Sequence, residues 1–273
     1  MILVDGEYQD SIPVDDRGLA YGDGLFETIQ IDNGRPVLWK RHFRRLQKGC
    51  GILGINVVDT DILLAECLQL CQNRNRGIIK IILTRGSGGR GYRPDKNSLT
   101  RRIISFHDWP EYPEDNVSTG IRLYRCSTPV SSNAHLAGLK TLCRLEQVLA
   151  QMEWDEAQFS EGLMLDDNKQ VVEGTRSNVF IVKNDVLITP ELKRSGIKGI
   201  MRGVIVDMAQ SAGIQVQQRD LDHDEFIQAD EIFLCNSIIK VWPVKEYQGK
   251  MYSTGNITRN IMRQLRQQLG DYE

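Results

Sequence analysis

The sequence has few histidines and no long apolar run. Its four histidines lie far apart among 273 residues, and none forms a ligand pair with a nearby cysteine, so we expect no metal site. The longest apolar runs fall well short of the roughly 18 residues that a membrane-spanning helix needs. The first residues, "MILVDGEYQDS", include acidic residues and no basic region, so we expect no secretory signal.

The sequence also lacks an excess of charge of one sign. A formal net charge of -2 argues against nucleic acid or an anionic membrane as the main partner. Hydrophobic residues at 41% and charged residues at 26% are ordinary globular values. The length suits one large domain or two ordinary ones.

Paired cysteine spacings are missing as well. The six cysteines are scattered along the chain, which is typical of reduced thiols in the cytoplasm rather than of a disulfide framework. Cys67 and Cys71 are one helical turn apart in "LLAECLQLC", where we interpret them as small core residues.

The first part of the chain mixes strands and helices. Residues 1–8, 25–37, 77–86 and 101–107 have the β-branched or alternating character of strands, and we expect a turn region at "VDDRGLAYGDG" (residues 14–24). Residues 38–53 and residues 59–73 have helical periodicity, and Thr60 or Asp61 is the expected N-cap of the second helix. Two prolines and four acidic residues in "DWPEYPEDN" (residues 108–116) then interrupt every periodicity and predict a linker.

After the linker, strands again alternate with a few helices. Strands are expected within residues 121–126, 161–167, 178–184, 186–190 and 229–237, and helices near 199–213 and at the end of the chain. This order predicts an α/β, or mixed α+β, fold in two domains. We place a smaller N-terminal domain at residues 1–113 and a larger C-terminal domain at 118–273.

Lys140 lies in an unusual setting in "NAHLAGLKTLCRLEQVLA" (residues 133–150). Leucines and alanines surround it, yet a buried ammonium group is costly unless it is paired or gives up its proton. This stretch alone favours a surface lysine at the start of an amphipathic helix, with its stem along apolar neighbours.

Four further segments could bind an anion or a cation. The glycine-rich "RGSGGRGYRP" (residues 85–94) carries arginines that can meet a carboxylate, although a plain flexible loop is also consistent with it. Glu173 in "VVEGTRSNVF" is either a turn acid or a buried partner for a cation. "GIKGIMRG" offers free N–H groups at a helix start, where phosphate can bind, and "LCNS" ends a strand with polar Asn236 and Ser237.

Together these segments resemble the fold-type IV pyridoxal-phosphate enzymes. The order along the chain is similar, from the "H-x-x-R-L" segment (residues 42–46) through Lys140 and Glu173 to "GIMR" (residues 199–202) and the polar strand end. The resemblance extends from "DRGLAYGDGLFET" to "VWPV", which is nearly the whole chain. Within the family, "RGSGGRGY", "HLAGLK" followed by "RLEQVL", and "GIMR" look most like the aminodeoxychorismate lyases.

The resemblance implies a two-domain fold with pyridoxal 5'-phosphate between the domains. It implies that Lys140 forms the Schiff base with this cofactor and that Glu173 faces the pyridine nitrogen. The phosphate would be held by Arg45, the backbone of Ile200 and Met201, and the Ser237 hydroxyl, and Asn236 would also bind the cofactor. Arg90 and Tyr92 are the expected contacts to substrate carboxylates.

Two positions depart from the family pattern. Cys143 stands where relatives often have asparagine, and Met201 replaces a threonine seen in many aminotransferases. The methionine would remove one hydroxyl contact to the phosphate, and neither departure removes the residues expected for the chemistry.

The resemblance further implies a homodimer that converts 4-amino-4-deoxychorismate to 4-aminobenzoate and pyruvate, a step towards folate, and the cysteine pattern places it in the cytoplasm. A D-amino-acid or branched-chain aminotransferase is the alternative enzyme. A catalytically silent binding protein is the alternative outside enzymes, and loss of Lys140 or Glu173 would have favoured it.

Overall fold

The computed structural model describes residues 1–89, 91–95 and 97–269. The chain forms two compact units, each with its own sheet and core. The first unit contains Met1–Glu111 and also Leu139–Cys143, whereas the division expected from the sequence kept residues 118–273 together. The short segment joins the first unit because Thr141 forms an isolated bridge with Leu25, and the backbone N–H of Phe26 donates to the carbonyl of Lys140.

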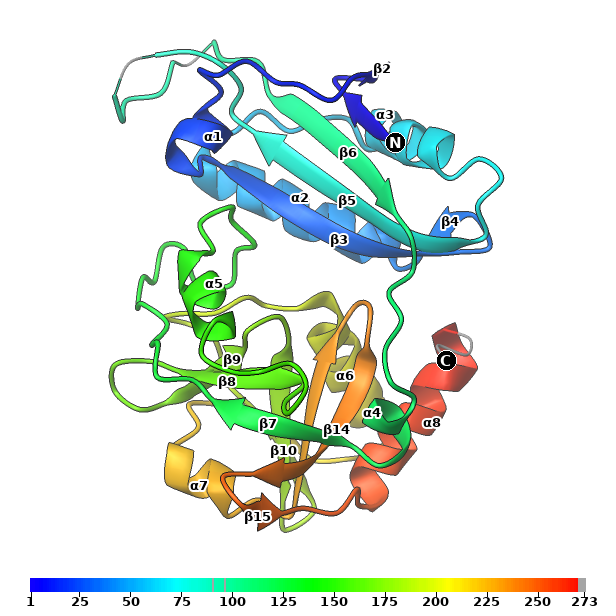
Figure 1. Cartoon of the computed structure of the whole chain (residues 1–273), viewed down its shortest axis with the longest axis vertical. Coiled ribbons are helices and arrows are strands. Elements are labelled where there is room, and N and C mark those ends of the chain that lie inside the picture. The colour runs from blue at the N-terminus through cyan, green and yellow to red at the C-terminus, as the bar shows by residue number, and fades with distance from the viewer. Residues whose placement is uncertain (90, 96, 270–273) are drawn as a thin grey trace. The chain divides into compact units, whose positions relative to one another are not determined.

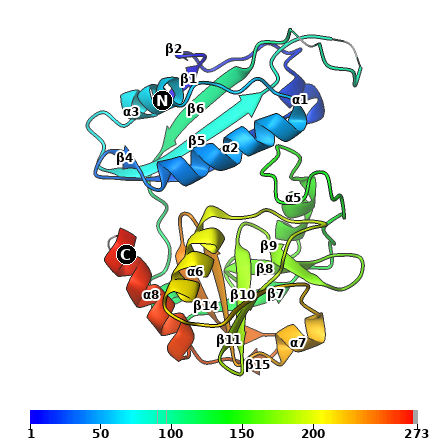
Figure 2. The same ribbon diagram turned by 180° about the vertical axis from the view of Figure 1, so that it is seen from behind.

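The first unit is an antiparallel sheet with helices packed on it (Figures 1 and 2). The six strands run in the order β2-β1-β6-β5-β3-β4. Their bounds are β1 (Ile2–Val4), β2 (Glu7–Tyr8), β3 (Gly24–Asp32), β4 (Arg35–Pro36), β5 (Arg76–Thr84) and β6 (Arg101–His107), and the helices are α1 (Arg17–Tyr21), α2 (Trp39–Leu53) and α3 (Thr60–Leu70). The core lies between the sheet and α2 and α3, where Leu46, Cys50, Leu63 and Cys67 pack against alternate strand residues.

Two local expectations for this unit were wrong. Asp59, rather than Thr60 or Asp61, caps α3, because its carboxylate accepts the N–H of Asp61 at 2.7 Å. The region before β3, expected as a turn, contains the short helix α1, which Asp16 caps through the N–H of Gly18.

The second unit is built on a nine-stranded mixed sheet (Figure 1). Its main path runs β12-β11-β10-β13-β14-β7-β8-β9, and β15 pairs with β14. The strands are β7 (Ile121–Arg125), β8 (Glu161–Leu165), β9 (Val171–Gly174), β10 (Asn178–Lys183), β11 (Val186–Thr189), β12 (Val216–Gln218), β13 (Glu231–Asn236), β14 (Lys240–Tyr247) and β15 (Lys250–Met251). The helices are α4 (Asp115–Ser118), α5 (Leu145–Gln151), α6 (Ile200–Ser211), α7 (His223–Ile227) and α8 (Asn256–Leu269).

Side chains are buried on both faces of the central strands of this sheet. Residues of β10 and β13 are buried in succession, which explains their continuous hydrophobic runs. On one face Val179, Leu234 and Trp242 belong to the main core, and on the other Phe180 and Phe233 stack with ring centroids 4.9 Å apart. None of the helices in the described part of the chain combines the length and apolar character that a bilayer crossing requires.

Candidate functional site

Lys140 is held in an extended segment beside the start of β3. Its carbonyl accepts the backbone N–H of Phe26 at 2.9 Å, and its Nζ lies 4.1 Å from the centroid of the Phe26 ring. An ammonium group at this distance from an aromatic face has a favourable cation–π interaction. The main chain and the ring together therefore fix the direction of the lysine side chain.

The apolar run around Lys140 does not form one buried shell. Leu139 is buried, but Leu136 and Leu145 are exposed, and Lys140 itself is half-buried. The lysine also does not begin a helix, because α5 starts at Leu145. The apolar contact of Lys140 is thus made by an aromatic ring from another segment, which the local sequence could not indicate.

Arg45 belongs to a buried charged cluster between α2 and β3. Its Nε and Nη2 donate to the two carboxylate oxygens of Glu27 at 2.7 and 2.6 Å. The Nδ1 of His42 lies 2.6 Å from the same carboxylate. Burial alone would raise the pKa of Glu27, but the charge of Arg45 and the hydrogen bonds from His42 and Arg45 outweigh it and lower that pKa to about 2.

A buried arginine fastens the glycine-rich loop. Arg17 is 3% exposed, its Nη1 donates to the carbonyl of Gly91 at 2.9 Å, and its Nη2 donates to the carbonyl of Tyr92 at 3.1 Å. Its Nε donates to Asp23, which also accepts two hydrogen bonds from Arg85. Since an arginine fork fixes several acceptors at once, this cluster holds the backbone of Gly91 and Tyr92 in place.

Of the two residues expected to contact substrate carboxylates, the structure describes only Tyr92. Arg90 lies outside the described residues. The side chain of Tyr92 is 87% exposed, and its ring centroid is 5.6 Å from that of Tyr21. A role of either in substrate binding stays a prediction.

Glu173 is buried within β9 and is not a turn acid. Its Oε2 accepts the backbone N–H of Ile197 at 2.8 Å, and the residue is 3% exposed. Gly196, next to Ile197, has a φ of +76° and approaches so closely that an added Cβ would lie 3.2 Å from Oε2. A carboxylate held in this way is suited to face a cationic or protonated group.

Ile200 and Met201 are the first two residues of α6, and both are buried. The N-cap is Gly199, which has no side chain to occupy the first N–H groups of this twelve-residue helix. Asn178 holds the approach to the helix, because its amide accepts the N–H of Gly199 at 3.0 Å and donates to the carbonyl of Ile197 at 2.8 Å. An added Cβ at Gly199 would lie 2.0 Å from Asn178 Oδ1, so only glycine fits there.

The polar end of β13 forms a tight turn into β14. Asn236 Oδ1 accepts the N–H groups of Ile238 and Ile239 at 2.8 and 2.9 Å, and the carbonyl of Ser237 accepts the Nζ of Lys240 at 2.6 Å. Asn178 of β10 pairs with Cys235 of β13, so this turn and the start of α6 are brought to the same end of the sheet. The joint role of these two segments in binding a phosphate stays a prediction.

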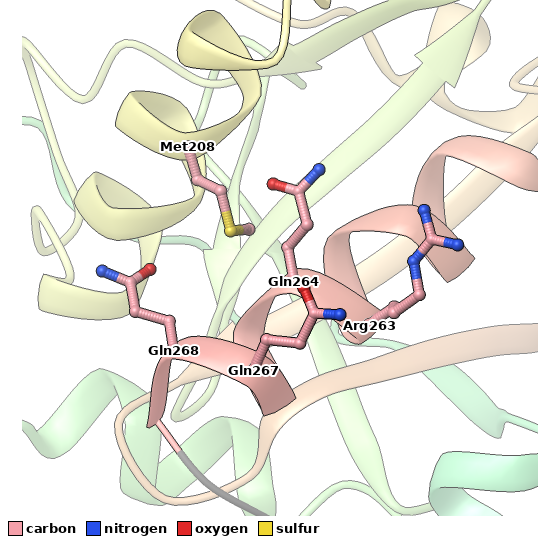
Figure 3. A pocket seen from close by; sticks show the side chains of 5 residues that line it. All are labelled: Met208, Arg263, Gln264, Gln267 and Gln268. Atoms are coloured by element: carbon pink, nitrogen blue, oxygen red, sulfur yellow. The ribbon is translucent and has the colours of Figure 1, made fainter.

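A separate groove in the second unit holds none of the predicted site residues (Figure 3). It is lined by Met208 of α6 and by Arg263 and three glutamines of α8. Met208 lies two turns from the start of α6, so the groove is remote from the Gly199 end of that helix. Its neutral amides and single arginine offer no nucleophile.

Sequence reasoning missed several residues that organise these clusters, namely Arg17, Phe26, Glu27, Asn178 and Lys240. For Glu27 a signal was present. In "LFETIQI" it occupies an alternate position between Leu25 and Ile29, which marks a carboxylate on the core face of a strand. His42 and Arg45 are three residues apart on one face of the following helix. They are therefore natural candidates for the partners of the Glu27 carboxylate.

Comparisons with known proteins identify a family and several similar proteins. A family model described as Amino-transferase class IV matches residues 24–247. An aminodeoxychorismate lyase of Vibrio harveyi is 33% identical over 269 residues, which cover 97% of this chain and 99% of that protein. The crystal structure of a 4-amino-4-deoxychorismate lyase from Pseudomonas aeruginosa is 44% identical with a TM-score of 0.96, and the match covers 99% of this chain and 100% of that one.

A more distant solved structure has the same fold. A branched-chain amino acid aminotransferase of Escherichia coli is 26% identical with a TM-score of 0.86, over 96% of this chain and 92% of its own. The fold-type IV class and the similarity to aminodeoxychorismate lyases, both expected from the sequence, are thereby confirmed. The chain belongs to the amino-transferase class IV family.

Proposed function

We propose that the protein is a pyridoxal-phosphate-dependent lyase that converts 4-amino-4-deoxychorismate to 4-aminobenzoate and pyruvate. The observation that carries this proposal is the 44% identity, over the full length, to a solved 4-amino-4-deoxychorismate lyase. The presence of Lys140 and Glu173 in ordered positions supports an active enzyme rather than a silent binding protein.

The chemistry of the two units fits this cofactor. A phosphate is suited to the glycine-capped start of α6, with Ile200, Met201, Asn236 and Ser237, and to the guanidinium of Arg45. A pyridine nitrogen is suited to the buried carboxylate of Glu173. These assignments, together with substrate contacts by Arg90 and Tyr92, extend what the family implies to this chain.

Lys140 has two tasks in the proposed reaction. Its amine would hold the cofactor, and as a free amine it would take the proton from the ring carbon that bears the substrate nitrogen. When bound, pyridoxal phosphate supplies an electron-withdrawing ring for the electrons of that carbon. Glu173 would hold the proton on the ring nitrogen. Loss of the enolpyruvyl group, which takes up a proton to become pyruvate, would leave an aromatic product, so no second substrate is needed.

We further propose that the protein is a homodimer in the cytoplasm. The helix α5 supports self-association, because Leu145, Val148, Leu149 and Met152 form one apolar stripe and are each 53 to 77% exposed. A two-fold contact would bury this stripe against its own copy. All six cysteines are free thiols, which supports a reducing compartment.

The product assay separates the lyase from an aminotransferase. With 4-amino-4-deoxychorismate and no keto acid, we expect 4-aminobenzoate and pyruvate in equal amounts over many turnovers. An aminotransferase leaves the amine on its cofactor and needs a keto acid to turn over again. Turnover of amino acids that depends on 2-oxoglutarate, without 4-aminobenzoate, would contradict the proposal.

A further inference from the structure

Glu27 is a carboxylate on the core face of β3. It is 1% exposed, and its neighbours on the same face, Leu25 and Ile29, are apolar and equally buried. Burying a carboxylate is costly, and an apolar residue of similar size often serves the fold as well as a buried ion pair does. The position of Glu27 therefore calls for a role beyond packing.

The contacts of Glu27 fix the plane of one guanidinium group. Both carboxylate oxygens are used, since Arg45 Nε donates to Oε1 at 2.7 Å and Nη2 donates to Oε2 at 2.6 Å. Parallel hydrogen bonds of this kind define orientation as well as distance. The Nδ1 of His42, at 2.6 Å, acts as a donor to the ionised carboxylate and holds it from a second side.

The side chain of Glu27 is inaccessible to solvent, whereas that of Arg45 is partly exposed. The side chain of Arg45 is 13% exposed, against 1% for Glu27. A ligand can therefore meet Arg45 but not Glu27, which acts only through the arginine. Glu27 is a positioning residue in this arrangement.

The residue before Glu27 holds Lys140. Phe26 donates its N–H to the Lys140 carbonyl and places its ring 4.1 Å from Nζ, while Glu27 points to the other face of the strand and holds Arg45. In pyridoxal phosphate, the aldehyde and the arm that carries the phosphate occupy neighbouring ring positions. Consecutive residues of β3 thus fix the lysine proposed for the aldehyde and the arginine proposed for the phosphate.

We infer that Glu27, supported by His42, orients the Arg45 guanidinium for the phosphate of the cofactor and thereby contributes to phosphate recognition. This inference rests on the proposed function, which assigns the phosphate to Arg45. It predicts a defect that depends on the phosphate group and not on the ring.

The test compares two ligands on the full chain. Dissociation constants for pyridoxal 5'-phosphate and for pyridoxal, which lacks the phosphate, are measured by absorbance for the wild type and for Glu27→Gln. We expect the substitution to weaken pyridoxal 5'-phosphate by about tenfold or more, the scale on which a misplaced contact acts. Binding of pyridoxal should change by less than about threefold, a difference below 1 kcal/mol.

Glu66→Gln is the matched control. Glu66 is also a buried carboxylate of the first unit, and it accepts hydrogen bonds from Nε and Nη2 of a single arginine, Arg102. Its substitution removes a similar ion pair between α3 and β6. Any change in ligand binding by this variant therefore reflects lost stability of the fold alone. We expect the ratio of the two dissociation constants to stay at the wild-type value.

Two results would overturn the inference. Either Glu27→Gln weakens both ligands by the same factor, as a structural role would, or it leaves both unchanged. If Glu27→Gln does not fold, Glu27→Asp replaces it, because aspartate keeps the charge but is too short to keep both hydrogen bonds to Arg45 in place, and the same selective loss is then required. A wild type that binds the cofactor but forms no 4-aminobenzoate would instead refute the proposed function and leave this comparison intact.

Discussion

The Nζ of Lys140 lies 4.1 Å from the centroid of the Phe26 ring, and the backbone N–H of Phe26 donates to the Lys140 carbonyl at 2.9 Å. The neighbouring N–H of Leu142 donates to the carbonyl of Gly24 in the same manner. The lysine segment is thus held as an added extended strand beside the start of β3. Its position depends on main-chain hydrogen bonds, which most side-chain substitutions leave in place.

Replacement of Glu173 by glutamine tests the role of its charge. Glu173→Gln keeps the shape of the side chain and can still accept the N–H of Ile197. We expect turnover to fall by about 100-fold or more while cofactor binding largely survives, because the ring nitrogen loses the anion that keeps it protonated. Steady-state kinetics beside a cofactor titration give the answer, and turnover within about threefold of the wild type would reduce Glu173 to a structural acid.

Removal of Arg17 is expected to loosen the glycine-rich loop. Arg17→Ala deletes the donors to the carbonyls of Gly91 and Tyr92 and the cation 4.7 Å above the Tyr21 ring. We expect faster hydrogen exchange and faster proteolysis in the described part of this loop, with little change at β10 in the second unit. Exchange rates in the loop that match the wild type would show that Arg17 does not fasten it.

The stability of the chain should fall in acid in a defined window. The folded pKa of Glu27 is about 2 against its ordinary 4.5, so the folded chain binds fewer protons between these values. The corresponding stabilisation, roughly 3 kcal/mol, is complete above pH 4.5 and is lost as the pH falls towards 2. Burial also lowers the pKa of His42 below 6.5, which has the same sign and starts the loss near that pH.

Urea unfolding of the wild type and of Glu27→Gln at several pH values checks this window. We expect the free energies of unfolding to differ most above pH 5 and to converge towards pH 3. If the difference in the free energy of unfolding between the two proteins stayed constant down to pH 3, the Glu27 carboxyl would not titrate with an altered pKa.

One thiol should react much faster than the other five. Cys143 is exposed, whereas the remaining cysteines are buried. Burial raises the pKa of Cys50 and Cys71 to about 11 and that of Cys126 and Cys235 to about 12, and it also raises the pKa of Cys67. A thiol-specific chromophore should therefore count one fast group in the native protein, and Cys143→Ser should abolish it; a second fast group would contradict this burial pattern.

The sequence predicted those elements whose pattern is local. Residues 101–107 form β6 as expected, and the expected helix at 38–53 is α2. β14 was missed because Pro243 interrupts its apolar run, although the pairing of Pro243 with Phe233 keeps it in the sheet. β9 is too short to have a period of its own, and its identity as a strand depends on its pairing with β8.

The sequence suggested which residues belong to the candidate site, but it could not indicate which residues contact them. Lys140, Arg45 and Glu173 were expected from motif order, yet their partners come from other elements. Glu27 reaches Arg45 only because α2 packs on the sheet, and Arg17 meets Gly91 across 74 positions of sequence. Such contacts depend on how elements pack, which no window of the sequence contains.

The attachment point of the cofactor tests the account most directly. The protein is incubated with pyridoxal 5'-phosphate, reduced with borohydride, digested and analysed by mass spectrometry. We predict one modified peptide, with the label on Lys140, and its complete loss in Lys140→Ala, which should remain folded but lose nearly all turnover. A label on any other lysine, or a Lys140→Ala protein with substantial activity, would contradict the account.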